Sequence, residues 1–278
     1  MFSLILAIFS SAMIAVIMRF AQNRVHYPIG LLAGNYIICT LMALILSAPA
    51  LPILSVQSLQ FPGGLGVLNG LLYLGSFALM QWNTQHNGVV LSSVFMKLGI
   101  LVPTLLSVLW FREIPTTVQI LGFLIALIAI VILNYQKGSK LKRSSWALLL
   151  MLLVGGMGDG MSKIYEVYGS AQLQNLFLFF TFLSALVFCL ILMKYKKECL
   201  GKKELLFGIA LGIPNFLSSL FLLNALATVP AVIAFPTFSV AVIAVVAVVG
   251  ILFFHERLTR KQLLGALLIC ISLILLNI

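Results

Sequence analysis

Apolar runs, each about 20 residues long, follow one another along almost the whole chain and are separated by short breaks. A helix needs roughly 20 apolar residues to cross the hydrocarbon core of a bilayer. The pattern therefore predicts ten membrane-spanning helices. Their expected bounds are Phe2–Phe20, Pro28–Ala48, Gly63–Trp82, Gly88–Phe111, Thr117–Tyr135, Ser145–Tyr165, Gln172–Met193, Leu205–Ala227, Ala231–Phe254 and Gln262–Ile278.

The composition excludes an ordinary soluble domain. Of the 278 residues, 62% are hydrophobic and 8% are charged, whereas soluble domains are roughly 45–50% apolar and about 25% charged. We expect an all-α integral membrane protein, because only helices and closed barrels satisfy the backbone in lipid. The first run is read as a helix rather than a signal peptide, since no basic residue precedes it.

Basic residues gather in the connections on one side of the predicted helices. Fourteen of the 17 lie there: Arg19, Arg24, Lys137, Lys140, Lys142, Arg143, Lys194, Lys196, Lys197, Lys202, Lys203, Arg257, Arg260 and Lys261. The positive-inside rule makes this side cytoplasmic and places both termini outside. The net charge of +11 is therefore read as a topology signal in the cell inner (plasma) membrane, not as a nucleic-acid surface.

The chain contains an internal repeat with an offset of 143 positions. Ten of 24 residues are identical between the segments that start at Phe111 and Phe254, including Glu113/Glu256, Thr116/Thr259, Gln119/Gln262, Gly122/Gly265 and Asn134/Asn277. The same offset lays the first helix on the sixth. We expect a first five-helix repeat over residues 1–136, a basic linker over 137–144 and a second repeat over 145–278.

An odd number of helices in each copy means that the second copy enters the membrane in the opposite sense. Inverted repeats of this kind are typical of secondary transporters, which bind solutes near the bilayer midplane and alternate access between two sides. A duplicated scaffold without transport is the alternative interpretation.

The chain resembles the drug/metabolite transporter superfamily, in particular its EamA-type members. The resemblance is carried by an apolar helix, a Phe-x-Glu turn and a Gly-containing last helix at Phe111–Gly122 and Phe254–Gly265, and by the run from Ala225 and Leu226 to Pro236. It implies a ten-helix basket with a central cavity lined in part by the first and sixth helices. It also implies transport driven by gradients or exchange, of solutes that range from amino acids and sugars to choline-like cations and drugs.

Motifs for other chemistries are missing from the sequence. The pair Gly201-Lys202 lacks the glycine and Ser/Thr of a phosphate-binding loop, and no Ser/His/Asp arrangement or H-E-x-x-H is present. The cysteines stand singly, without metal spacing, and are read as packing residues: Cys39, Cys189, Cys199 and Cys270. We expect no enzyme activity, no cofactor and no metal site.

Lys97 lies in the middle of the fourth predicted span. A lone ammonium at that depth costs about 2.5–3.5 kcal/mol, so Lys97 should face a cavity or a partner. In the functional interpretation, Lys97 is a counter-charge for an anionic or zwitterionic substrate, or a proton-linked group. In the alternative interpretation, it is one half of a structural ion pair. Its counterpart in the second repeat is Val240.

The sixth predicted span carries three charges on one helical face: Asp159, Lys163 and Glu166. Asp159 is the candidate partner of Lys97 or site of a coupling proton, and a pair with Lys163 is the competing reading. The surrounding glycines, among them Gly156 and Gly160, favour close helix packing.

Polar and aromatic residues in other spans complete the predicted substrate-binding lining: Asn35, Asn69, Tyr73, Ser76, Gln81, Trp82, Asn215, Ser219, Asn224 and Phe235. Each has an alternative reading as an interhelical hydrogen bond or interfacial anchor. Prolines 103, 214, 230 and 236 are expected to kink or break helices. Glu113 and Glu256 are expected to cap helix N-termini.

The sequence thus predicts a secondary active transporter of a small organic metabolite, either an importer or an exporter. Its expected partners are the substrate, a proton or exchanged solute, and lipid. Efflux of drugs or other lipophilic cations is the alternative within transport. An intramembrane enzyme or a structural subunit is the alternative outside it.

Overall fold

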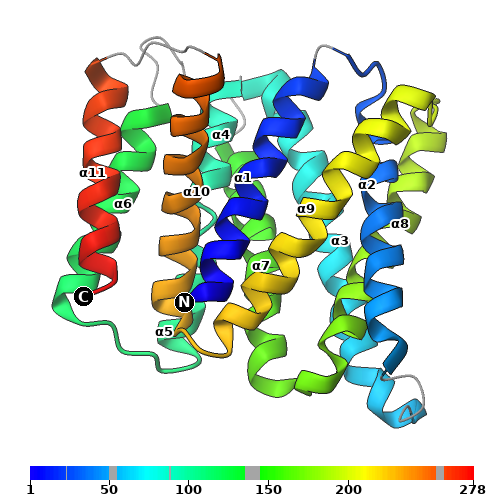
Figure 1. Ribbon diagram of the computed structural model, residues 1–278, viewed down its shortest axis with the longest axis horizontal. Helices are drawn as coiled ribbons and strands as arrows, with labels where there is room; N and C mark the ends of the chain where they lie inside the picture. The colour runs from blue at the N-terminus through cyan, green and yellow to red at the C-terminus, as the bar shows by residue number, and fades with distance from the viewer. Residues whose placement is uncertain (23, 50–54, 88, 135–144, 255–259) are drawn as a thin grey trace. The chain divides into compact units, whose positions relative to one another are not determined.

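The computed structural model describes residues 1–22, 24–49, 55–87, 89–134, 145–254 and 260–278, and that part of the chain contains helices and turns without strands (Figure 1). The helices are α1 (Phe2–Gln22), α2 (Pro28–Ser47), α3 (Val56–Asn87), α4 (Val89–Leu98), α5 (Leu101–Leu109), α6 (Thr117–Asn134), α7 (Ser145–Tyr168), the short 3₁₀ turn η2 (Ala171–Leu173), α8 (Gln174–Tyr195), α9 (Lys202–Leu226), α10 (Ala231–Phe254) and α11 (Arg260–Leu276).

Many of these helices suit a membrane. Seven are long and apolar enough to cross one: Phe2–Ala21, Pro28–Ser47, Val56–Asn87, Trp146–Tyr168, Ala171–Tyr195, Lys202–Leu226 and Ala231–Gly250. Three shorter apolar helices follow Phe95–Leu109, Thr117–Ile132 and Leu264–Leu276. The chain is therefore a multi-pass membrane protein.

Two elements differ most from the sequence prediction, whereas the bounds of the other helices differ from it by at most three residues. α3 begins at Val56 instead of Gly63. The backbone N–H of Ser58 donates to Ser55 Oγ at 3.1 Å, and the N–H of Ser55 donates to Ser58 Oγ at 3.0 Å. These two bonds cap an earlier turn of the helix. The fourth predicted span is two helices, α4 and α5, with a break at Gly99 and Ile100.

The start of α6 explains one of the repeated motifs. The backbone N–H of Thr116 donates to Gln119 Oε1 at 3.0 Å, and the N–H of Gln119 donates to Thr116 Oγ1 at 3.2 Å. This is a reciprocal capping box, which satisfies two amides that the helix leaves open. The matching residue Thr259 lies outside the described residues.

The described chain divides into two compact units, and each combines segments of both sequence halves. Unit 1 contains residues 1–74 and 161–225, and unit 2 contains 75–160 and 226–278. The long helices α3 and α7 contribute residues to both.

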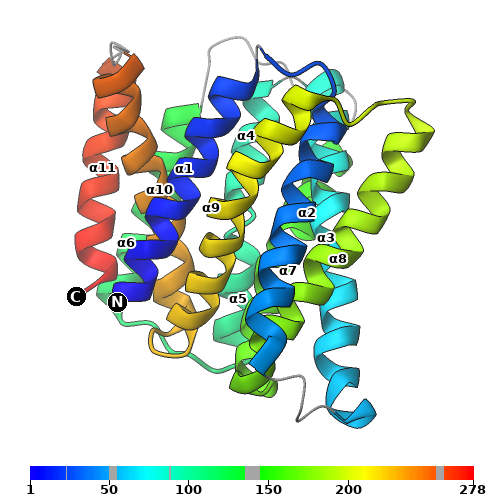
Figure 2. The ribbon, with the colours of Figure 1, turned by 45° about the vertical axis from the view of Figure 1, so that its right-hand side comes forward.

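In unit 1, the repeat-related helices α2 and α8 lie side by side (Figures 1 and 2). Asn175, at the start of α8, donates to the Leu46 carbonyl near the end of α2 at 2.9 Å, and Cys189 donates to the Ile29 carbonyl at 3.5 Å. The two helices therefore run antiparallel. α2 also touches α9, where a Cβ added to Gly208 would lie 2.7 Å from Gly34 Cα.

In unit 2, the repeat-related helices α6 and α11 pack against each other (Figure 1). Gly122, early in α6, meets the end of α11, since a Cβ added there would lie 2.9 Å from Leu275 Cβ. These helices are antiparallel too. Their shared core contains Ala126, Ile130 and Ile269 together with Val240 of α10, which is fully buried.

Candidate functional site

The break between α4 and α5 follows directly after Lys97. At this point the backbone bonds span three residues instead of four: the N–H of Gly99 donates to the Met96 carbonyl at 3.2 Å, and that of Ile100 donates to the Lys97 carbonyl at 3.5 Å. Pro103 has no N–H for the Gly99 carbonyl, and its ring would clash with that carbonyl in a continuous helix. The sequence expectation of a break near Pro103 is confirmed.

The other prolines differ in their effect. Pro230 lies between α9 and α10, as expected of a residue that breaks a helix. Prolines 214 and 236 instead lie inside continuous helices.

α7 approaches the break through its glycines. A Cβ added to Gly156 would collide with the carbonyl oxygen of Gly99 and lie 2.6 Å from Val102 Cβ. One turn later, a Cβ at Gly160 would lie 3.5 Å from the Leu106 side chain of α5. Small residues at these positions let the α7 backbone touch the interrupted helix.

Lys97 and Asp159 lie in the same unit, on either side of this glycine contact. Lys97 is two residues before Gly99, and Asp159 is one turn beyond Gly155 and Gly156. The described part of the chain leaves much of both side chains uncovered, and the two opposite charges are close enough to influence each other. Within the described chain they form no direct ion pair or hydrogen bond. Neither charge is therefore neutralised by a direct contact within the described chain.

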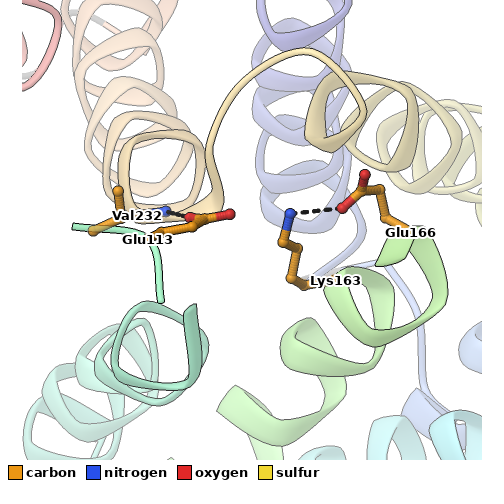
Figure 3. A network of polar contacts seen from close by, with 4 residues as sticks. All are labelled: Glu113, Lys163, Glu166 and Val232. Carbon is orange, nitrogen blue, oxygen red and sulfur yellow. Dashed lines mark hydrogen bonds and ion pairs between the residues drawn. The ribbon is translucent and has the colours of Figure 1, made fainter. Parts of the chain in front are cut away.

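The other described carboxylates have structural partners. Glu113 accepts a hydrogen bond from the Val232 backbone N–H at 2.9 Å, and Glu166 pairs with Lys163 at 2.6 Å (Figure 3). The capping role predicted for Glu113 is confirmed, and Glu256 lies outside the described residues. Lys163 thus has a partner in Glu166, which weakens the competing reading that paired it with Asp159.

The two remaining carboxylates belong to unit 1, and the sequence analysis missed their roles. Glu198 accepts from the Ile29 N–H at 2.8 Å, and Glu204 accepts from the N–H groups of His26 and Tyr27 at 3.0 and 3.4 Å. Both hold the start of α2. Acidic residues close to helix ends were the signal in the sequence, but the amides they bind are 169 to 178 positions away.

The candidates Ser76, Gln81, Trp82 and Phe235 also belong to unit 2. Ser76 faces α7, because a Cβ at Gly155 would lie 3.5 Å from its hydroxyl oxygen. Trp82 stacks on His86 with ring centroids 4.1 Å apart. Gln81 is half-buried and Phe235 is buried.

Asn83, which the sequence analysis passed over, lies on the same part of α3. Its amide donates to the Leu79 carbonyl at 2.9 Å and to the Ala147 carbonyl of α7 at 3.0 Å, and it accepts from Asn87 at 2.8 Å. The four-residue spacing of the two asparagines in an apolar segment was the signal for a polar link to another helix.

Unit 1 contains the candidates Asn35, Asn69, Tyr73, Asn215 and Asn224. The structure brings two of them together: the Asn215 amide donates to Asn35 Oδ1 at 3.1 Å, and the buried Cys39 thiol contacts both side chains. Asn69 is buried, and its Oδ1 has no hydrogen-bond partner in the described chain. Asn224 is half-buried.

An aromatic cluster lies beside this asparagine pair. The ring of Phe182 is 6.4 Å from Tyr36, 6.4 Å from Tyr73 and 6.2 Å from Phe216, measured between centroids. Tyr73 and Phe216 occupy equivalent positions in the sequence repeat. The two copies thus place aromatic rings against the same side chain.

Metal-ligating side chains do not gather at any of these places. Over the described ranges, no group of three or more His, Cys, Asp or Glu residues could hold a metal ion.

Comparison with known proteins agrees with this architecture. An uncharacterized protein of Haemophilus influenzae (strain ATCC 51907 / DSM 11121 / KW20 / Rd) is 26% identical over 277 residues, which cover 95% of this chain and 94% of that protein. A protein of known crystal structure superposes with a TM-score of 0.77 over 99% of this chain and 94% of its own, at 13% identity. This second likeness concerns the fold alone.

The sequence pattern of the EamA-like transporter family matches residues 1–135 and 141–278. The match covers nearly the full length and falls separately on the two halves. It confirms the resemblance expected from the sequence: the chain belongs to the EamA-like transporter family.

Proposed function

We propose that the chain is a secondary active transporter of a small organic metabolite, and that Lys97 and Asp159 bind the substrate or a coupling proton. The observation that carries the proposal is a pair of opposite charges beside a helix break, neither of which forms an ion pair or hydrogen bond within the described chain. Ionisable groups inside membrane spans are costly and mark solute pathways, and interrupted helices form the binding sites of several transporter folds.

The second half of the chain supports this assignment by contrast. Val240, the counterpart of Lys97, is buried in the core between α6, α10 and α11. α10 is continuous where α4 and α5 are separated. The charge and the break are therefore not needed to build this helix, which favours a binding role in the first copy.

Inverted repeats are a common basis of alternating access, and the directions of the helices support that arrangement. The repeat-related pairs α2/α8 and α6/α11 are antiparallel, as expected if the second copy is inverted. We propose ten spans: the seven long apolar helices and the three shorter ones, with α4 and α5 forming one interrupted span.

Efflux of lipophilic cations is the second candidate. The carboxylate of Asp159 favours a cation. Lys97 opposes it, since its ammonium would repel a cationic substrate. We therefore favour a substrate that carries an anionic group.

Counterflow tests the proposal with a mixture of solutes, so that the substrate need not be chosen beforehand. Full-length protein is reconstituted in vesicles that contain an unlabelled bacterial metabolite extract from which ATP has been removed, and a ¹³C-labelled extract, also free of ATP, is added outside. Mass spectrometry should detect chemically unchanged labelled compounds inside without ATP, in wild-type vesicles and not in Lys97→Met vesicles. An absolute requirement for ATP, or conversion of a labelled compound, would contradict the proposal.

A further inference from the structure

A cavity lies in unit 1 at the end of α1, whereas Lys97 and Asp159 belong to unit 2. Its volume is about 450 Å³, within the range of small-molecule sites. It is lined by Ala15, Met18, Arg19, Ala21, Val25, Pro28 and Leu31. Six of these seven side chains are apolar, and the seventh carries a positive charge.

The position of the cavity suits the interface between lipid tails and headgroups. Arg19 is in the last turn of α1, where an apolar span ends. Nearby, Phe20 and Tyr27 expose 44% and 39% of their surface. The Arg24 guanidinium lies 5.7 Å from the centroid of the Phe20 ring. Aromatic and basic side chains together are typical of the headgroup region.

The walls of the cavity are held in place. Ala21 and Leu31 belong to a buried cluster that includes Leu211 of α9, and Val25 packs against it. Just before α2, the N–H groups of His26 and Tyr27 donate to Glu204. Arg19 places a positive charge in the lining of this cavity.

We propose that this cavity binds an anionic glycerophospholipid, with its phosphate at Arg19 and part of an acyl chain against the apolar wall. Arginine pairs well with phosphate, and basic pockets between helices bind anionic headgroups. A soluble phosphate would gain nothing from the apolar lining, whereas a zwitterionic lipid would lack the net charge. The proposal does not depend on transport.

Native mass spectrometry tests the site on full-length protein in micelles that contain equal amounts of phosphatidylglycerol and phosphatidylcholine. Wild type should retain phosphatidylglycerol preferentially. Arg19→Gln should lower that retention about fivefold. This ratio corresponds to about 1 kcal/mol, the binding free energy that one basic residue contributes near an anionic surface. Ala15→Leu should lower it as well, because it fills the cavity and leaves the charge.

The matched control is Lys203→Gln. Lys203 is an exposed basic residue at the start of α9, on the same predicted face but outside the cavity lining. The proposal is overturned if Lys203→Gln lowers retention as much as Arg19→Gln, or if a folded Ala15→Leu variant retains phosphatidylglycerol like wild type. It is also overturned if millimolar glycerol phosphate displaces the lipid, which would indicate a site for soluble anions.

Discussion

Carboxylates are scarce in this chain, and their partners separate structural groups from the candidate functional one. Four described acidic residues bind backbone amides or Lys163: Glu113, Glu166, Glu198 and Glu204. Asp159 differs from them, because it forms no hydrogen bond or ion pair within the described chain. A charge in an apolar span without a hydrogen bond is poorly explained by stability alone.

Neutral variants of this pair should lose transport without losing the fold. We expect Lys97→Met and Asp159→Asn each to reduce counterflow by at least about tenfold, which corresponds to a loss of roughly 1.4 kcal/mol of binding free energy. The melting temperatures of both variants should stay close to that of the wild type. Glu166→Gln is the control for the loss of a structural ion pair. It removes the charge that pairs with the buried Lys163, and it should lower the free energy of unfolding by about 2 kcal/mol. If the single variants unfold and the double variant recovers stability, Lys97 and Asp159 form a structural pair instead.

Lys197 offers a test of backbone strain at the end of α8. It has a left-handed backbone with φ of 55°, and the N–H of Glu198 donates to the Met193 carbonyl at 3.0 Å across this turn. Such a C-terminal turn favours glycine. Lys197→Gly should stabilise the protein by about 0.5–1 kcal/mol in thermal melting, whereas Lys196→Gly, at an ordinary φ of −83°, should destabilise it. Equal melting shifts for the two variants would contradict this account.

At the scale of helices, the decisive feature is the interruption after Lys97. The combination of Gly99 and Pro103 removes one backbone bond and leaves the chain free to turn. Two glycines of α7, Gly156 and Gly160, then bring the backbone of that helix against the turn, because they have no side chains to separate the two. Both charges lie within a few residues of this contact along the chain.

Two neighbouring glycines of α7 test the contact. A Cβ at Gly156 would collide with the Gly99 carbonyl, whereas one at Gly155 would make an ordinary 3.5 Å contact with Ser76. Gly156→Ala should therefore cost about 1–3 kcal/mol in melting experiments and reduce counterflow. Gly155→Ala should resemble wild type in both measurements. Similar losses in the two variants would show that helix flexibility, rather than this contact, explains the effect.

Helix positions could be predicted well because the apolar runs and their breakers are local signals. α10 has the bounds expected from the sequence, and α6 begins at the expected Thr117. The early start of α3 was missed because its cap consists of two serines in a segment read as a loop. Lys97 and Asp159 stood out by charge alone. The pairing of Asn215 with Asn35 could not be predicted, since it joins residues 180 positions apart.

At the scale of the whole molecule, the sequence repeat and the compact units divide the chain differently. Each unit pairs a helix of one half with its counterpart in the other, α2 with α8 in unit 1 and α6 with α11 in unit 2. The repeat itself is visible in the sequence, but the pairing across halves arises from packing, as at Gly122 against Leu275.

Membrane orientation is a property of the whole chain that can be tested directly. Fourteen of the 17 basic residues fall in connections on one predicted side, and lysine and arginine are retained in the cytoplasm during insertion. A phosphatase fused after Ile278 should therefore be active outside, and a green fluorescent protein fused there should be dark. Neutral residues at Lys140, Lys142 and Arg143 should weaken this preference, since they remove three of the charges. A fluorescent fusion with an inactive phosphatase would reverse the assignment and place the Arg19 cavity in the outer leaflet.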